Sequence, residues 1–133
     1  MFVYYKLWNS GNYQTECYIW LFTDTPGKPE PLDVTKNTIT LVWTRPKNDG
    51  GSKIIGYYVE AMKLPGDTWI RCNTSSQNVP REEYRATGLD EDVKYQFRVI
   101  AKTAVNMSRP SEISDPILVS AENGKDKIEI KRE

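Results

Sequence analysis

The chain has 133 residues, enough for one domain whose core needs neither disulfides nor metal. Its 18 basic residues balance 18 acidic ones without a long run of either sign, which argues against a nucleic-acid or membrane-surface partner. No apolar run reaches the roughly 20 residues that cross a bilayer. The absence of histidine removes the commonest general base and metal ligand, which argues against an enzyme.

Residues 1–25 form an aromatic-rich segment that holds eight of the fifteen aromatic side chains. One interpretation is a hairpin of 3–8 and 17–22, reversing at Asn9–Asn12, with its aromatic face docked on another surface. Another is an extension without fixed structure. A secretory signal peptide is disfavoured, because the apolar run after Cys17 is short, lies late and lacks a small-residue cleavage site. Residues 1–25 are therefore predicted to be separate from the domain.

Residues 26–122 are strand-like throughout, with short alternating runs and turn residues about every ten positions. This pattern predicts an all-β, seven-stranded antiparallel sandwich. In the turns, Asn48–Gly51 and Pro65–Asp67 supply residues that tolerate reversal. The charged segment 123–133 is predicted to be a tail or linker. The expected strands are 31–35, 38–44, 54–62, 68–73, 83–87, 93–103 and 113–120.

Alternation within these runs predicts which side chains are buried. In the run 38–44, Ile39, Leu41 and Trp43 are expected to point inward and the threonines outward. In the run 93–103, the charged residues are expected to face solvent. The structural core is predicted to contain Trp43, Tyr57, Leu89, Tyr95, Phe97 and Val99.

Four motifs make residues 26–122 resemble a fibronectin type III module: "TLVWTRP", "DGGSKIIGYYVE", "GLDEDVKYQFRVIA" and "SRPSEISDP". The six-residue step from Leu89 to Tyr95 is similar to the tyrosine corner of that family. There, a tyrosine hydroxyl bonds to backbone just upstream, which lets the ring be buried. The resemblance implies the same bond here.

Further motifs, "PGKPEPLDVTKNTITLVW", "DTWIRCN" and "FRVIAK", are similar to modules of the giant sarcomeric proteins, titin most of all. Myosin-binding protein C and the twitchins share many of these motifs. The chain departs from the subgroup at Thr103, where Asn is usual, and at Asn106 and Asp92, where Gly is usual. Asn106 is expected to keep the turn in a left-handed conformation.

The resemblance implies a cytoplasmic, sarcomeric module, monomeric in isolation, that acts as spacer and scaffold in a tandem array. Implied partners are neighbouring immunoglobulin-like or fibronectin modules, with myosin and myosin-binding protein C as further candidates. The alternative is an extracellular adhesion or receptor module that binds a protein ligand. Two cysteines, Cys17 and Cys72, are too few for a disulfide framework; two reduced thiols are expected, with a single bridge as the alternative.

No catalytic, cofactor-binding or metal site is predicted. Serine nucleophiles lack a histidine partner, and the carboxylates of 90–92 lack the spacing of a calcium loop. Trp69, Arg71 and Arg98 have two interpretations: an exposed cation–π ladder that binds a partner, or a half-buried tryptophan covered by arginine stems. Asn73–Ser75 and Asn106–Ser108 are glycosylation sequons on expected loops.

Overall fold

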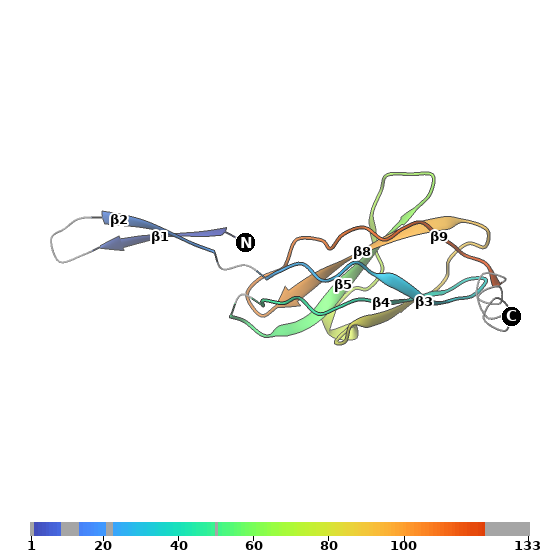
Figure 1. Cartoon of the computed structure of the whole chain (residues 1–133), viewed down its shortest axis with the longest axis horizontal. Helices are drawn as coiled ribbons and strands as arrows, with labels where there is room; N and C mark the ends of the chain where they lie inside the picture. Colours follow the sequence, from blue (N-terminus) through green and yellow to red (C-terminus); the bar gives the residue numbers. More distant parts are fainter. Residues whose placement is uncertain (1, 9–13, 21–22, 50, 122–133) are drawn as a thin grey trace, which may run out of the picture.

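The structure is a computed structural model that describes residues 2–8, 14–20, 23–49 and 51–121, with side chains from residue 23 onward. Seven strands form two antiparallel sheets that pack face to face (Figure 1). The three-stranded sheet has the order β3-β4-β7, and the four-stranded sheet the order β6-β5-β8-β9. The predicted seven-stranded β-sandwich is confirmed. The elements are β3 Glu30–Val34, β4 Ile39–Val42, β5 Ile54–Lys63, β6 Ile70–Arg71, a 3₁₀ turn Ser76–Asn78, β7 Glu83–Ala86, β8 Lys94–Thr103 and β9 Ile117–Leu118.

The amino-terminal segment contains two further strands, β1 (Phe2–Trp8) and β2 (Gln14–Trp20). They pair with each other in antiparallel register, from Phe2 opposite Trp20 to Trp8 opposite Gln14. The second strand begins and ends earlier than the alternation indicates. The predicted reversal at Asn9–Asn12 and the tail 123–133 lie outside the described residues, and docking of the aromatic face stays a prediction.

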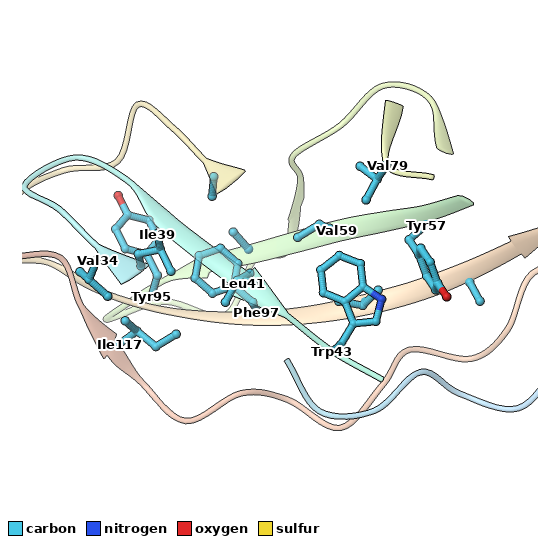
Figure 2. Packing of buried hydrophobic residues seen from close by; sticks show 14 of the residues in the cluster. Val34, Ile39, Leu41, Trp43, Tyr57, Val59, Val79, Tyr95, Phe97 and Ile117 are labelled. Carbon is cyan, nitrogen blue, oxygen red and sulfur yellow. The ribbon is translucent and has the colours of Figure 1, made fainter. Parts of the chain in front are cut away.

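Alternating side chains of the two long strands fill the space between the sheets (Figure 2). Val59 of β5 lies opposite Val99 of β8, and both are fully buried. Tyr57 and Phe97 are also fully buried, whereas Leu89 is half-buried and packs against the edge of the cluster. Burying such large apolar side chains is the main favourable term in folding.

Trp43 lies just beyond β4 and packs edge-on against Tyr57, with ring centroids 5.2 Å apart (Figure 2). Tyr57 Oη donates a hydrogen bond of 2.7 Å to Glu82, so the one polar atom of this buried ring has a partner. The buried indole N–H of Trp43 makes no hydrogen bond within the described residues. Thr38 departs from the expected outward orientation: it is buried, and its hydroxyl bonds to that of Thr35 at 2.6 Å.

β6 is shorter than the predicted strand 68–73, because a side chain replaces backbone pairing at its end. The carbonyl oxygen Oδ1 of Asn73 accepts from the amide of Val59, and Nδ2 donates to the carbonyl of Tyr57, both at 2.8 Å. Asn73 therefore pairs with β5 as a strand would, while its own backbone leaves the sheet for the 3₁₀ turn at Ser76–Asn78.

β9 is likewise shorter than the predicted strand 113–120, and serines explain the difference. The amides of Ser108, Ser111 and Ser114 each donate to β8, to the carbonyls of Ala101, Val99 and Phe97 respectively. The serine hydroxyls accept from the amides of those same three residues at 2.9 Å. We call residues 108–114 the serine segment; it pairs with β8 without strand geometry.

The corner before β8 contains the bond that the tyrosine-corner spacing predicts. The amide of Asp90 donates to Tyr95 Oη at 3.0 Å, so the prediction is confirmed. Asp92 has a φ of 64°, the one positive φ among the described non-glycine residues. Asn106 is not in that conformation, so the expectation of a left-handed Asn106 is wrong: Thr103 Oγ1 instead accepts from its amide at 2.9 Å and closes the turn.

The described chain enters the sandwich at one pole and leaves it at the other (Figure 1). At one pole, Thr23 Oγ1 donates to the carbonyl of Asp49 at 3.1 Å, and the amide of Asp24 donates to the carbonyl of Asn48 at 2.8 Å. At the other, the amide of Asp92 donates to the carbonyl of Val119 at 2.8 Å. The chain thus enters beside the turn between β4 and β5 and leaves beside the corner before β8.

Candidate functional site

The outer face of the four-stranded sheet carries the charged and aromatic side chains that sequence analysis singled out. Successive side chains of a strand point to opposite faces, so the burial of Tyr57, Val59 and Ala61 places Tyr58 and Glu60 outward. Register sets Glu60 opposite Arg98 of β8 on one side and opposite Arg71 of β6 on the other.

Glu60 is the centre of this face. Arg98 Nε donates to Glu60 Oε1 at 2.7 Å, and an Arg71 guanidinium nitrogen lies 3.5 Å from Oε2. The Glu60 side chain is 12% exposed, against 25% for Arg98 and 42% for Arg71. A carboxylate this far from water needs a partner, and the short charge-assisted bond from Arg98 supplies one. The more exposed Arg71 contributes less, because solvent screens it.

Each guanidinium also stacks on an aromatic ring. Arg98 Cζ lies 4.3 Å from the centroid of Trp69, and Arg71 Cζ lies 4.0 Å from that of Tyr58. Both distances lie within the range of attraction between a cation and a ring face. These five residues, Tyr58, Glu60, Trp69, Arg71 and Arg98, make up what we call the arginine–aromatic face.

The three predicted residues thus lie on one face, but in a different arrangement from a single ladder. Trp69 contacts Arg98, whereas Arg71 stacks on Tyr58 and shares Glu60 with Arg98. Trp69 is half-buried, as expected for a tryptophan that is covered by an arginine side chain. Sequence analysis missed Glu60 and Tyr58. Their place in the alternation of β5 indicates an outward orientation, but their partners depend on the register with β6 and β8.

Other sequence candidates do not form a reactive site. Within the described residues, no group of His, Cys, Asp or Glu side chains is placed to hold a metal ion. Asp90 instead pairs with Lys63 across the surface. Cys72 carries a free thiol, and burial, with a smaller contribution from Glu60, raises its pKa to about 11. That thiol is protonated near neutral pH and is a poor nucleophile.

A cleft of about 330 Å³ opens beside this thiol, between the edges of the two sheets. It is lined by mostly apolar atoms, among them Ile70, Cys72 and Leu89. Tyr84 Oη donates to the carbonyl of Cys72 at 3.3 Å and links the sheets there.

No helix in the described part of the chain is long and apolar enough to span a membrane.

Comparisons with known proteins agree with this architecture. Residues 24–116 match the fibronectin type III domain family. Roundabout homolog 1 of Mus musculus is 39% identical over 98 residues, which are 73% of this chain and 6% of that protein. Cardiac-type myosin-binding protein C of Mus musculus is 36% identical over 96 residues, 71% of this chain and 7% of that protein. The chain therefore spans a small fraction of the relatives it matches.

Among solved structures, a titin module from human cardiac muscle is 47% identical with a TM-score of 0.65. The match covers 71% of this chain and 90% of that one. The resemblance to modules of sarcomeric giants is thereby confirmed. Because the family match spans well over half of the sequence and the two antiparallel sheets form the predicted sandwich, the chain belongs to the fibronectin type III domain family.

Proposed function

We propose that this chain is a non-catalytic link in a tandem array of fibronectin and immunoglobulin-like modules of a sarcomeric giant protein, where it acts as spacer and scaffold. The observation that carries the proposal is the placement of the two chain ends at opposite poles, beside Asn48 and beside Asp92. A module built this way adds its own length to an array. The resemblance to titin and myosin-binding protein C supports a cytoplasmic, sarcomeric location.

The pairing of the terminal strands supports a load-bearing role. A pull on both ends acts along β3, which is bonded to β4, and along the serine segment, which is bonded to β8. Since the ends leave at opposite poles, these bonds are loaded together along the strands. The ion pair of Lys28 with Asp115, at 3.0 Å, adds an exposed link between the two terminal segments. Resistance of this kind is kinetic, because it sets the rate of opening.

The arginine–aromatic face is the surface that we propose for contact with partners. It offers stacked rings and guanidinium groups, the side chains that dominate many protein interfaces. Neighbouring modules, myosin and myosin-binding protein C are the candidate partners. Myosin is a candidate because one relative of this chain is named myosin-binding protein C.

A second candidate is an extracellular adhesion or receptor module that recognises a protein ligand. The 39% identity to Roundabout homolog 1 supports it; this value is similar to the 36% to cardiac myosin-binding protein C and lower than the 47% to the titin module. The two candidates place the chain in different compartments. Immunolocalisation of the natural protein separates them: striated labelling inside muscle fibres supports the link, and labelling at the surface of unpermeabilised cells supports the receptor.

Single-molecule stretching tests the proposed load-bearing role. The full chain is placed between well-characterised modules and pulled through both ends. We expect one cooperative unfolding event, with a contour gain of roughly 3.4 Å for each residue released. A chain that extends smoothly without a force peak would contradict the proposal. A variant with Lys28→Ala serves as the matched comparison, since the pair it removes is exposed and is expected to contribute little.

A further inference from the structure

The two glycosylation sequons occupy contrasting environments. Asn73 is 5% exposed and lies at the end of β6, against the middle of β5. Its Oδ1 accepts from the amide of Val59, and Nδ2 donates to the carbonyls of Tyr57 at 2.8 Å and Ser75 at 2.9 Å. Both hydrogens of the amide nitrogen, and its oxygen, are therefore used by the fold.

N-glycosylation acts on that same nitrogen. Nδ2 attacks the anomeric carbon of a lipid-linked oligosaccharide, the carbon–oxygen bond to the lipid diphosphate breaks, and one amide hydrogen leaves as a proton. A glycosylated Asn73 would keep one hydrogen for two acceptors, and a sugar would stand where the chain is closely packed. An orphaned buried carbonyl and an overfilled site each destabilise the folded state.

Asn106 is half-buried, but its side chain has none of these hydrogen bonds. Its backbone holds the turn after β8, since its amide donates to Thr103 Oγ1 and its carbonyl accepts from the Thr103 amide at 2.8 Å. Its side-chain amide makes no hydrogen bond to the described residues. The flanking Val105 and Met107 are 73% and 40% exposed, so this turn projects into solvent.

We propose that N-glycosylation at Asn73 and folding of this module exclude each other, whereas Asn106 carries a glycan without loss of the fold. The inference is independent of the proposed function, because it rests on the side-chain bonds of one residue. In a secretory compartment, Asn73 is then a position where modification before folding traps the chain, whereas a glycan on Asn106 is compatible with the folded module.

Cys72 provides a direct test, because it immediately precedes Asn73. A recombinant thioester of residues 1–71 is ligated to synthetic 72–133, which begins with the cysteine that native ligation requires. Three full-length chains are made in this way: unmodified, with one N-acetylglucosamine on Asn73, and with the same sugar on Asn106. Each is refolded by dilution and followed by tryptophan fluorescence and urea unfolding.

The unmodified chain and the Asn106 glycoform are expected to unfold cooperatively at the same urea concentration. The Asn73 glycoform is expected to show no cooperative transition, or a midpoint lowered by more than half. An Asn73 glycoform that unfolds at the midpoint of the unmodified chain would overturn the proposal, and so would an Asn106 glycoform that fails to fold. The unmodified ligated chain controls for the ligation itself.

Discussion

Ser111 and Val99 exchange two hydrogen bonds across the edge of the four-stranded sheet: the Ser111 amide donates to the Val99 carbonyl at 2.8 Å, and the Val99 amide donates to Ser111 Oγ at 2.9 Å. In a regular antiparallel pair, both acceptors are backbone carbonyls. Here the hydroxyl replaces one of them, which frees the Ser111 backbone from strand geometry. The hydroxyls of Ser108 and Ser114 replace backbone carbonyls in the same way. The serine segment therefore stays bonded to β8 from Ser108 to Ser114.

Ser111→Ala removes the acceptor of the buried Val99 amide. We expect a loss of about 1–3 kcal/mol in the free energy of unfolding, because a buried donor is left without a partner. Urea unfolding measures the loss, and amide exchange at Val99 should accelerate more than at other β8 positions. Thr74→Ala, at an exposed site, is the control. Unchanged stability in Ser111→Ala would mean that water reaches the Val99 amide.

Tyr95→Phe removes the hydroxyl that accepts from the Asp90 amide. The ring stays in the core, so the expected loss is about 1 kcal/mol, the net value of one hydrogen bond. Thermal and urea unfolding check this value. Tyr58→Phe is the matched control, since its hydroxyl makes no hydrogen bond to the described residues. Equal effects of the two substitutions would show that the corner bond adds no stability.

Glu60→Gln removes the charge that holds the two guanidinium groups of the arginine–aromatic face. We expect a loss of about 1 kcal/mol and a change in Trp69 fluorescence, because Arg98 loses its carboxylate partner while it lies over that ring. A double-mutant cycle with Arg98→Met isolates the pair, and Glu83→Gln on the other sheet is the control. Additive effects would show that Glu60 and Arg98 are not coupled.

Alkaline pH should destabilise the fold. Burial raises the pKa of Cys72 from 9.0 to about 11, and burial also raises the pKa of Tyr57. Since the folded state then binds more protons than the unfolded state, the stability these groups contribute is complete below about pH 9 and falls as pH rises through the folded pKa values. Urea midpoints between pH 7 and 11 measure the fall.

Cys72→Ala should flatten that pH profile between pH 9 and 11. The thiol of Cys72 should also react slowly with alkylating reagents at pH 8 in the folded chain and faster in urea. A folded-state reaction as fast as that in urea would contradict the assigned burial.

The long strands and their buried faces could be predicted from the alternation of hydrophobic residues. Phe97 and Val99 fall on one side of a long alternating run, so both the strand and its buried face can be inferred from the chain. The structural roles of Asn73 and Ser111 could not be predicted, because a side chain that replaces a backbone hydrogen-bond partner leaves no periodic signal in the sequence. Glu60 required the register between strands, which depends on contacts distant in sequence.

The serine segment also sets how far the chain can lengthen before its core opens. Ser108 to Ser114 covers six residue steps, yet it runs beside only the four steps from Ala101 to Phe97. A fully extended strand advances about 3.3 Å per residue, so release of this segment would supply roughly 7 Å of slack. Loss of these bonds would therefore absorb a small displacement while β5 and β8 remain joined.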